Sequence, residues 1–169
     1  LLFLGDAKDE LAIKTAAGIN YWRPEWCIGQ MSLPNAKSSL GINEISLEEA
    51  VKQGAKTFVL GVVNAGGKMP EGWIDIIVKA ISLGLNIASG MHSRLSSFDE
   101  ISKAAIKHGV KLHDLRYNNI EFDTGKGLKR TGKRLLTVGT DCSVGKKYTA
   151  LAVEKAMLEK NMKVSFKAT

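Results

Sequence analysis

One apolar segment limits the possible folds more than any other part of the chain. Residues 57–63 read Thr-Phe-Val-Leu-Gly-Val-Val, so an extended strand here would be apolar on both faces. Such a strand is typical of the middle of a parallel sheet that helices cover. Because parallel neighbours are joined by helical crossovers, we expect strands and helices to alternate along the chain.

The first part of the chain, to about residue 116, shows this alternation. Short apolar segments predict strands at residues 1–4, 26–29, 57–63, 85–88 and 110–112. Amphipathic segments predict helices at residues 9–17, 46–54, 71–83 and 97–108, and residues 32–45 are expected to form a loop. Ser46 and Ser97 each stand three residues before a glutamate, the pattern of a helix-capping box. We expect Ile101, Ala104, Ala105 and Ile106 on the buried face of the last of these helices. The fold class is therefore α/β with a mostly parallel sheet.

A polar, glycine-bearing stretch at residues 117–132 separates this part from a second motif. Residues 134–138 predict a strand, a loop bounded by two glycines follows, and a helix then continues to about Lys160, with a further strand at residues 164–166. We expect the buried side of that helix to include Leu151 and Leu158. The backbone N–H groups of such a loop, with the positive end of the following helix, form an anion site. The predicted phosphate-binding residues are Gly139, Thr140, Asp141, Cys142, Ser143, Val144, Gly145, Lys146 and Lys147.

Two departures from the usual P-loop qualify this motif. The loop between Gly139 and Gly145 is one residue longer than the common form, and Lys147 replaces the Ser or Thr that holds Mg²⁺. A phosphate site is therefore expected, and a metal is not. Cys142 is either a nucleophile with a lowered pKa or a small residue that the loop tolerates, and we favour the second because no histidine is adjacent.

Charge and composition restrict the partners and the compartment. The formal net charge is +7, and Lys126, Lys129, Arg130, Lys133 and Arg134 lead directly into the P-loop, where they could supplement an anion site. No aromatic residues interleave with these cations, which argues against nucleic acid as a partner. The apolar runs are too short to cross a membrane, and the two cysteines have no metal-ligand spacing, so a reduced, cytoplasmic protein is expected.

The ends of the chain and of its sheet carry two further expectations. The chain starts within one expected strand and stops just after another, so we expect it to be part of a protein about twice as long. An exposed sheet edge favours association into a homo-oligomer.

Loops that follow the expected strands supply the candidate site, because the carboxyl ends of parallel strands gather at one edge of the sheet. His92 would be a general base or would simply bond a neighbouring carbonyl. Arg94 and Arg116 would bind substrate carboxylates or pair with Asp99 or Asp114. The small residues of the loop after residue 63 indicate either a tight turn or a close approach of the backbone to something else. The ligand-loop candidates are Asn64, Gly66, Gly67 and Asp114.

Several of these segments together resemble one known family. They are residues 55–67, 86–95, 111–116 and 132–146, and they look like the DgcN-type D-glutamate N-acetyltransferase family. The resemblance implies a Rossmann-like domain at residues 1–120, a linker at 121–132, and the N-terminal part of a P-loop NTPase-like domain at 133–169. It also implies transfer of the acetyl group of acetyl-CoA to the amino group of D-glutamate, the first step of a catabolic route that a partner enzyme completes. In this interpretation the P-loop holds CoA phosphates, and Lys146 and Lys147 replace a metal.

Two other classes of function stay open. The loop alone is similar to that of dethiobiotin synthetase, which allows an ATP- or GTP-dependent ligase or kinase. A non-catalytic nucleotide-binding protein is the other alternative. For both of these, ATP rather than acetyl-CoA would occupy the P-loop, although Lys147 argues against an ordinary Mg²⁺-dependent hydrolysis.

Overall fold

The computed structural model describes residues 1–63, 65–117, 125, 127–129, 131–141 and 144–167. The chain divides into two compact units, a first unit of Leu1–Glu121 and a second unit of Phe122–Thr169. In the described part of the chain, no helix combines the length and the apolar composition that crossing a bilayer requires.

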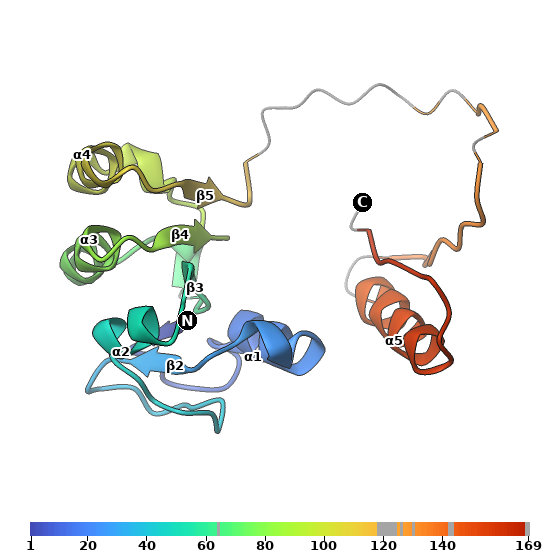
Figure 1. Ribbon diagram of the computed structural model, residues 1–169, viewed down its shortest axis with the longest axis horizontal. Helices are drawn as coiled ribbons and strands as arrows, with labels where there is room; N and C mark the ends of the chain where they lie inside the picture. Colours follow the sequence, from blue (N-terminus) through green and yellow to red (C-terminus); the bar gives the residue numbers. More distant parts are fainter. Residues whose placement is uncertain (64, 118–124, 126, 130, 142–143, 168–169) are drawn as a thin grey trace. The chain divides into compact units, whose positions relative to one another are not determined.

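A five-stranded sheet forms the centre of the first unit (Figure 1). The strands are β1 (Leu2–Gly5), β2 (Gln30–Ser32), β3 (Thr57–Leu60), β4 (Asn86–Ser89) and β5 (Leu112–Asp114). Every neighbouring pair is parallel, and the order across the sheet is β2-β1-β3-β4-β5. The apolar segment at residues 57–63 thus supplies the central strand, and the predicted parallel α/β fold is confirmed.

The α-helices of the first unit cover the two faces of the sheet unequally. They are α1 (Lys14–Trp22), α2 (Leu47–Lys52), α3 (Ile74–Ser82) and α4 (Asp99–His108), with short 3₁₀ helices η1 (Pro24–Trp26), η2 (Ala65–Gly67), η3 (Glu71–Trp73) and η4 (Leu95–Ser97). In Figure 1, α2, α3 and α4 lie on one side of the sheet and α1 lies on the other. Helix α1 packs directly against the backbone of Gly61 through Ala16. A Cβ on Gly61 would lie only 2.5 Å from the Cβ of Ala16, so a larger residue would push α1 away.

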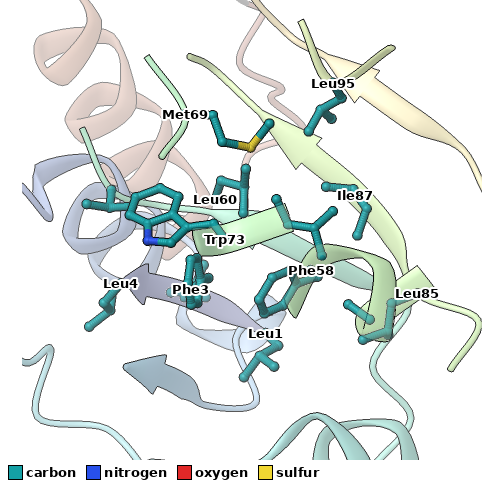
Figure 2. Packing of buried hydrophobic residues seen from close by; sticks show 14 of the residues in the cluster. Leu1, Phe3, Leu4, Phe58, Leu60, Met69, Trp73, Leu85, Ile87 and Leu95 are labelled. Atoms are coloured by element: carbon teal, nitrogen blue, oxygen red, sulfur yellow. The ribbon is translucent and has the colours of Figure 1, made fainter. Parts of the chain in front are cut away.

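The core of the first unit lies mainly under α2, α3 and α4. Strand register places Phe3 beside Leu60 and Phe58 beside Ile87, so these side chains share one face, and all of them are buried. The rings of Phe3 and Phe58 have centroids 5.1 Å apart, and Trp73 packs edge-on against Phe3 at 5.2 Å (Figure 2). Trp73 thereby ties the start of α3 to the central strands.

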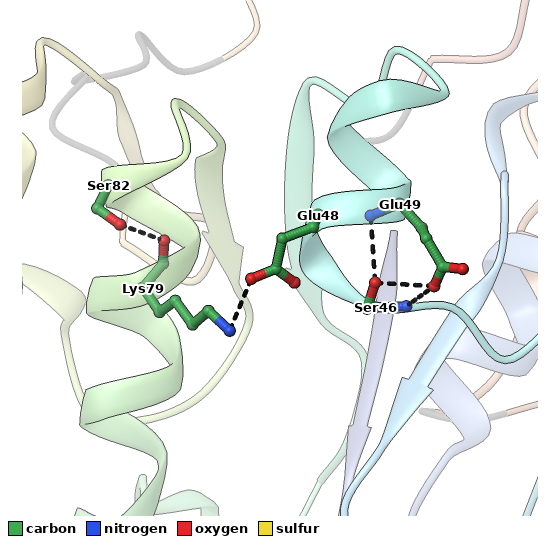
Figure 3. A network of polar contacts seen from close by, with 5 residues as sticks. All are labelled: Ser46, Glu48, Glu49, Lys79 and Ser82. Carbon is green, nitrogen blue, oxygen red and sulfur yellow. Dashed lines mark hydrogen bonds and ion pairs between the residues drawn. The ribbon is translucent and has the colours of Figure 1, made fainter.

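A capping box begins α2, as the sequence predicts. The Ser46 hydroxyl accepts the N–H of Glu49, and the Glu49 carboxylate accepts the N–H of Ser46 at 2.8 Å (Figure 3). Next to it, Glu48 forms an ion pair with Lys79 of α3, with Oε1 and Nζ 2.8 Å apart. The hydrogen bond from Lys79 lowers the pKa of Glu48, and hydrogen bonds from Ser46 lower the pKa of Glu49. These contacts stabilise α2 and join it to α3.

The largest differences from the predicted element boundaries concern β2 and α1, and β3 ends at Leu60 rather than at residue 63. Residues 26–29 are not a strand, because Pro24 starts the short helix η1 and the Cys27 N–H bonds the Pro24 carbonyl, so β2 begins only at Gln30. Helix α1 begins at Lys14 rather than at residue 9, because the Asp9 carboxylate accepts the N–H of Ala12 in a local turn.

Two predictions about α4 were also wrong. Ser97 lies in η4 and donates its hydroxyl to the Arg94 carbonyl at 2.7 Å, so it does not cap α4. Ile101 and Ala105 are buried one turn apart, as expected, but Ile106 is 80% exposed. One residue along a helix turns the side chain by about 100°, which carries Ile106 off the buried face.

The second unit contains helix α5 (Lys146–Glu159), which begins where the P-loop motif predicts. Strands were predicted at residues 134–138 and 164–166, but these described residues form none. A strand requires backbone hydrogen bonds to a neighbouring strand, and the described part of this unit contains no such pairing. Leu151 of α5 is buried as expected, whereas Leu158 is 50% exposed. Glu154 of α5 contacts residues 164–166, because its buried carboxylate accepts the N–H of Phe166 at 2.6 Å.

Candidate functional site

The loop after β4 packs tightly against the loop after β3. The His92 N–H donates to the Gly67 carbonyl at 2.8 Å, and Gly67 has a positive φ of 61°. A Cβ on Gly67 would lie 2.1 Å from Cδ2 of the His92 imidazole. Gly67 therefore serves both a turn and a close approach, and the group that approaches is His92. Gly66 also has a positive φ, of 77°, with open space around it, and Asn64 lies outside the described residues.

Tyr117, which the sequence analysis did not single out, joins two of the candidate residues. Its hydroxyl donates to the His92 carbonyl, and the Arg94 guanidinium lies 4.2 Å from the centre of its ring. The side chains of His92 and Arg94 are both exposed to solvent. Tyr117 could have been identified from its position, because it directly follows Arg116 in the loop after an expected strand.

The loops after β4 and β5 are also held to each other. The Asp114 carboxylate accepts the N–H of Leu95 at 2.7 Å, and Arg116 Nε donates to the Gly90 carbonyl at 3.2 Å. Asp99 pairs with Lys103 along α4, with Nζ and Oδ2 3.3 Å apart. The structure thus gathers His92, Arg94, Asp114 and Arg116 at one edge of the sheet. This arrangement offers an imidazole and two guanidinium groups on a braced set of loops.

The P-loop motif folds back on itself at the start of α5. A Cβ on Gly139 would lie 2.6 Å from Cγ2 of Val144, so the close approach requires a glycine there. Gly145 is the N-cap residue of α5, with a positive φ of 96°. The Lys146 ammonium donates to the Asp141 carbonyl, and the Thr137 hydroxyl donates to the Lys146 carbonyl at 2.9 Å. Cys142 and Ser143 lie outside the described residues.

This loop has features that are typical of a phosphate-binding site. The first N–H groups of a helix have no partner within it, and they point toward the N-terminal end of α5. Lys146 and Lys147 add two ammonium groups there, and Lys147 is exposed. Among the described residues, no group of three His, Cys, Asp or Glu side chains gathers as metal ligands would.

A cavity of about 420 Å³ opens between the loops that follow β1 and β3, and the sequence analysis did not identify it. The strand order is the reason: the sheet reverses its direction of growth between β1 and β3, and order cannot be read from apolar runs alone. The signal that was present is a charged segment directly after the first strand. The residues that line the cavity are Asp6, Ala7, Lys8, Asp9, Leu11, Ala12, Lys14, Val62, Val63 and Trp73.

Comparison with known proteins gives relatives for both units. A family model described as a Rossmann-like domain of unknown function, DUF1611_N, matches residues 32–118. A second, described as the DUF1611_C P-loop domain, matches residues 121–169. A crystal structure of a DUF1611 family protein from Anabaena variabilis matches 94% of the chain and 49% of that protein, with a TM-score of 0.67 and 24% identity, which shows the shared fold.

Two curated relatives align with every residue of the chain. A D-glutamate N-acetyltransferase from a Pseudoalteromonas species is 53% identical, and one from Tritonibacter scottomollicae is 48% identical. The chain spans 51% of the length of each. Both carry the name of the family that the sequence motifs resemble. The chain therefore belongs to the DUF1611 family, with a Rossmann-like domain followed by the start of a P-loop domain.

Proposed function

We propose that the protein transfers the acetyl group of acetyl-CoA to the amino group of D-glutamate. The observation that carries this proposal is the 53% identity, over all 169 residues, to a protein named for that activity. The proposal is tested by incubating the full-length protein with acetyl-CoA and D-glutamate and measuring release of the free CoA thiol. Turnover with D-glutamate is expected. A protein that releases no CoA, but hydrolyses ATP in the presence of a small substrate, would contradict it.

In this proposal the P-loop binds the phosphates of CoA. The place of this loop before the N-terminal end of α5 and the exposed side chain of Lys147 support that role, and the lysine in place of a metal-binding hydroxyl disfavours Mg²⁺-ATP. Calorimetry of the full-length protein should show acetyl-CoA binding that weakens about tenfold or more in Lys146→Ala, since one charge-assisted contact is lost. Lys155→Ala, an exposed lysine of the same helix, is the matched control. Tighter binding of ATP that depends on Mg²⁺ would contradict the proposal.

Acetyl transfer also requires a base that takes a proton from the substrate ammonium. His92 is our proposal for this role, because its imidazole is exposed at the sheet edge while its backbone is held by Gly67 and Tyr117. His92→Ala is expected to lower kcat about 100-fold or more, with little change in acetyl-CoA affinity. His108→Ala, an exposed histidine at the end of α4, is the control. Full activity of the His92 variant would exclude the role.

Arg94 and Arg116 stay the sequence-based candidates for binding the substrate carboxylates. Their contacts with Tyr117 and with the Gly90 carbonyl also brace the loops, so the two roles need separate tests. The physiological setting that we propose is breakdown of D-glutamate, with a partner enzyme consuming the N-acetylated product. A strain that lacks the gene should lose growth on D-glutamate as nitrogen source, and unimpaired growth would contradict that setting.

A further inference from the structure

The cavity between β1 and β3 lies where this class of fold places its ligands. In an open parallel sheet, ligands bind beyond the carboxyl ends of the strands, at the point where the strand order reverses. With the order β2-β1-β3-β4-β5, that point lies between β1 and β3. The residues lining the cavity come from the loops after these two strands, the start of α1, and Trp73. A volume of about 420 Å³ lies within the range of small-molecule sites.

The loop after β1 is unsuited to the phosphates that Rossmann-like folds often bind at this point. A phosphate site needs glycines and free backbone N–H groups directly after the first strand. Here Gly5 is followed by Asp6, and Asp9 and Glu10 come shortly after. The positive φ of Gly5, 55°, serves a close approach to Trp73 instead, since a Cβ would lie 2.5 Å from the indole.

The charges that line the cavity match a different kind of ligand. Lys8 and Lys14 supply two ammonium groups, and Asp6 and Asp9 supply two carboxylates. Asp9 is engaged by the N–H of Ala12 at 2.8 Å, and it shapes the turn before α1. Asp6 lies 3.7 Å from Lys8, and both of their side chains remain about half exposed. A ligand with two carboxylates and one ammonium group can replace this exposed Asp6–Lys8 ion pair, because each of the two side chains then meets an opposite charge on the ligand.

The remaining walls are apolar. Leu11, Val62, Val63 and Trp73 contribute side chains to the cavity, and Leu11 and Val63 are respectively 70% and 40% exposed. Apolar walls with a few placed charges are typical of small-molecule sites. They suit the methylene groups that separate the charged ends of a short dicarboxylic amino acid.

We propose that this cavity, the switch-point cavity, binds the dicarboxylic amino-acid substrate, with its carboxylates on Lys8 and Lys14 and its ammonium group on Asp6. The proposal rests on the acetyl-transfer function proposed above. It replaces Arg94 and Arg116 as the groups that hold the carboxylates. Strands β1 and β4 are two strand spacings apart, about 10 Å, and the loop that carries His92 follows β4 at the same edge of the sheet as the cavity.

The first test is steady-state kinetics of the full-length protein. Lys14→Gln is expected to raise the KM for D-glutamate about tenfold or more, because a charge-assisted contact is lost, and to leave the KM for acetyl-CoA unchanged. Lys107→Gln, an exposed lysine in the last turn of α4, is the matched control and should behave as the wild type. If Arg116→Gln raises this KM and Lys14→Gln does not, the switch-point cavity is not the substrate site.

The second test is calorimetric binding, which does not depend on turnover. Asp6→Asn should weaken D-glutamate about tenfold or more. It should not weaken glutarate, which has both carboxylates and no amino group. Equal weakening of the two ligands would overturn the assignment of Asp6 to the ammonium group.

The two tests separate this inference from the proposed function. Binding of D-glutamate that depends on Lys14, without acetyl transfer, would uphold the cavity and reject the proposed function. Acetyl transfer with a normal KM in Lys14→Gln would uphold the function and reject the cavity. Absence of both D-glutamate binding and turnover in the wild type would reject both.

Discussion

The two units of this chain contain similar apolar segments, but these segments are buried in the first unit and exposed in the second. In the first unit, apolar segments become paired strands, and every residue of the main hydrophobic cluster lies there. In the second unit, Leu135, Leu136 and Val138 are 69%, 70% and 78% exposed, although they read as a strand just as well. The difference is that each strand of the first unit has a parallel neighbour. An apolar run therefore predicts a need for burial, and neighbouring strands decide whether that need is met.

The comparison also separates two ways of building a binding site. In the first unit, candidate groups are held by bonds between loops, such as that from Leu95 to Asp114. In the second unit, the candidate phosphate-binding residues, among them Gly139, Gly145 and Lys146, lie within one continuous segment of loop and helix. A site of the second kind can be predicted from sequence alone, because its parts are adjacent in the chain. A site of the first kind depends on strand order.

The largest effect is expected from Trp73 in the first unit, and Leu136 in the second unit provides the comparison. Trp73→Ala should lower the free energy of unfolding by about 3–5 kcal/mol, because the indole is 3% exposed and packs on Phe3. In the 169-residue chain, Leu136→Ala should change it by less than about 0.5 kcal/mol, since its side chain is 70% exposed there. Urea unfolding followed by circular dichroism measures both values. A loss above 2 kcal/mol in Leu136→Ala would break the comparison.

A second pair of variants compares glycines with positive φ in the two units. Gly67→Ala should cost about 1–2 kcal/mol for the left-handed backbone, and it should also displace the His92 imidazole. Gly132 in the second unit has a φ of 86° with open space around it. Gly132→Ala should therefore cost only the free energy of the left-handed backbone. Acetyl transfer measured with urea unfolding distinguishes the two effects. Unchanged activity in Gly67→Ala would show that the position of His92 is not critical.

A smaller effect is expected where one sequence pattern has two structural outcomes. Ser46→Ala should cost about 1 kcal/mol, because it removes the cap of α2. Ser97→Ala should cost less than about 0.5 kcal/mol, because that hydroxyl bonds the Arg94 carbonyl and caps no helix. Thermal unfolding of both variants gives the difference. Equal costs would mean that Ser97 supports α4 in a way that the structure does not show.

These pairs indicate which features can be predicted from sequence. The start of the central strand at Thr57, the capping box at Ser46 and the start of α5 depend on local pattern, and all three were predicted correctly. The exposure of Ile106 depends on which face of α4 meets the sheet, and the turn at Ser97 depends on the short helix η4 that precedes α4. Neither of these two features was predicted. The switch-point cavity was missed for a related reason. It requires β1 and β3 to be neighbours, and no local pattern contains that information.

The smallest expected effect concerns pH. Lys79 lowers the pKa of Glu48, so the ion pair stabilises the fold above the ordinary glutamate pKa, about 4.3, and this contribution disappears as the pH falls through the lowered value. Glu48→Gln should therefore reduce stability slightly at neutral pH and leave it unchanged well below pH 4, as measured by urea unfolding across this range. The pair is exposed, so high salt should remove most of the difference between the two proteins. A difference that persists in acid would show that packing of the Glu48 side chain, rather than its charge, joins α2 to α3.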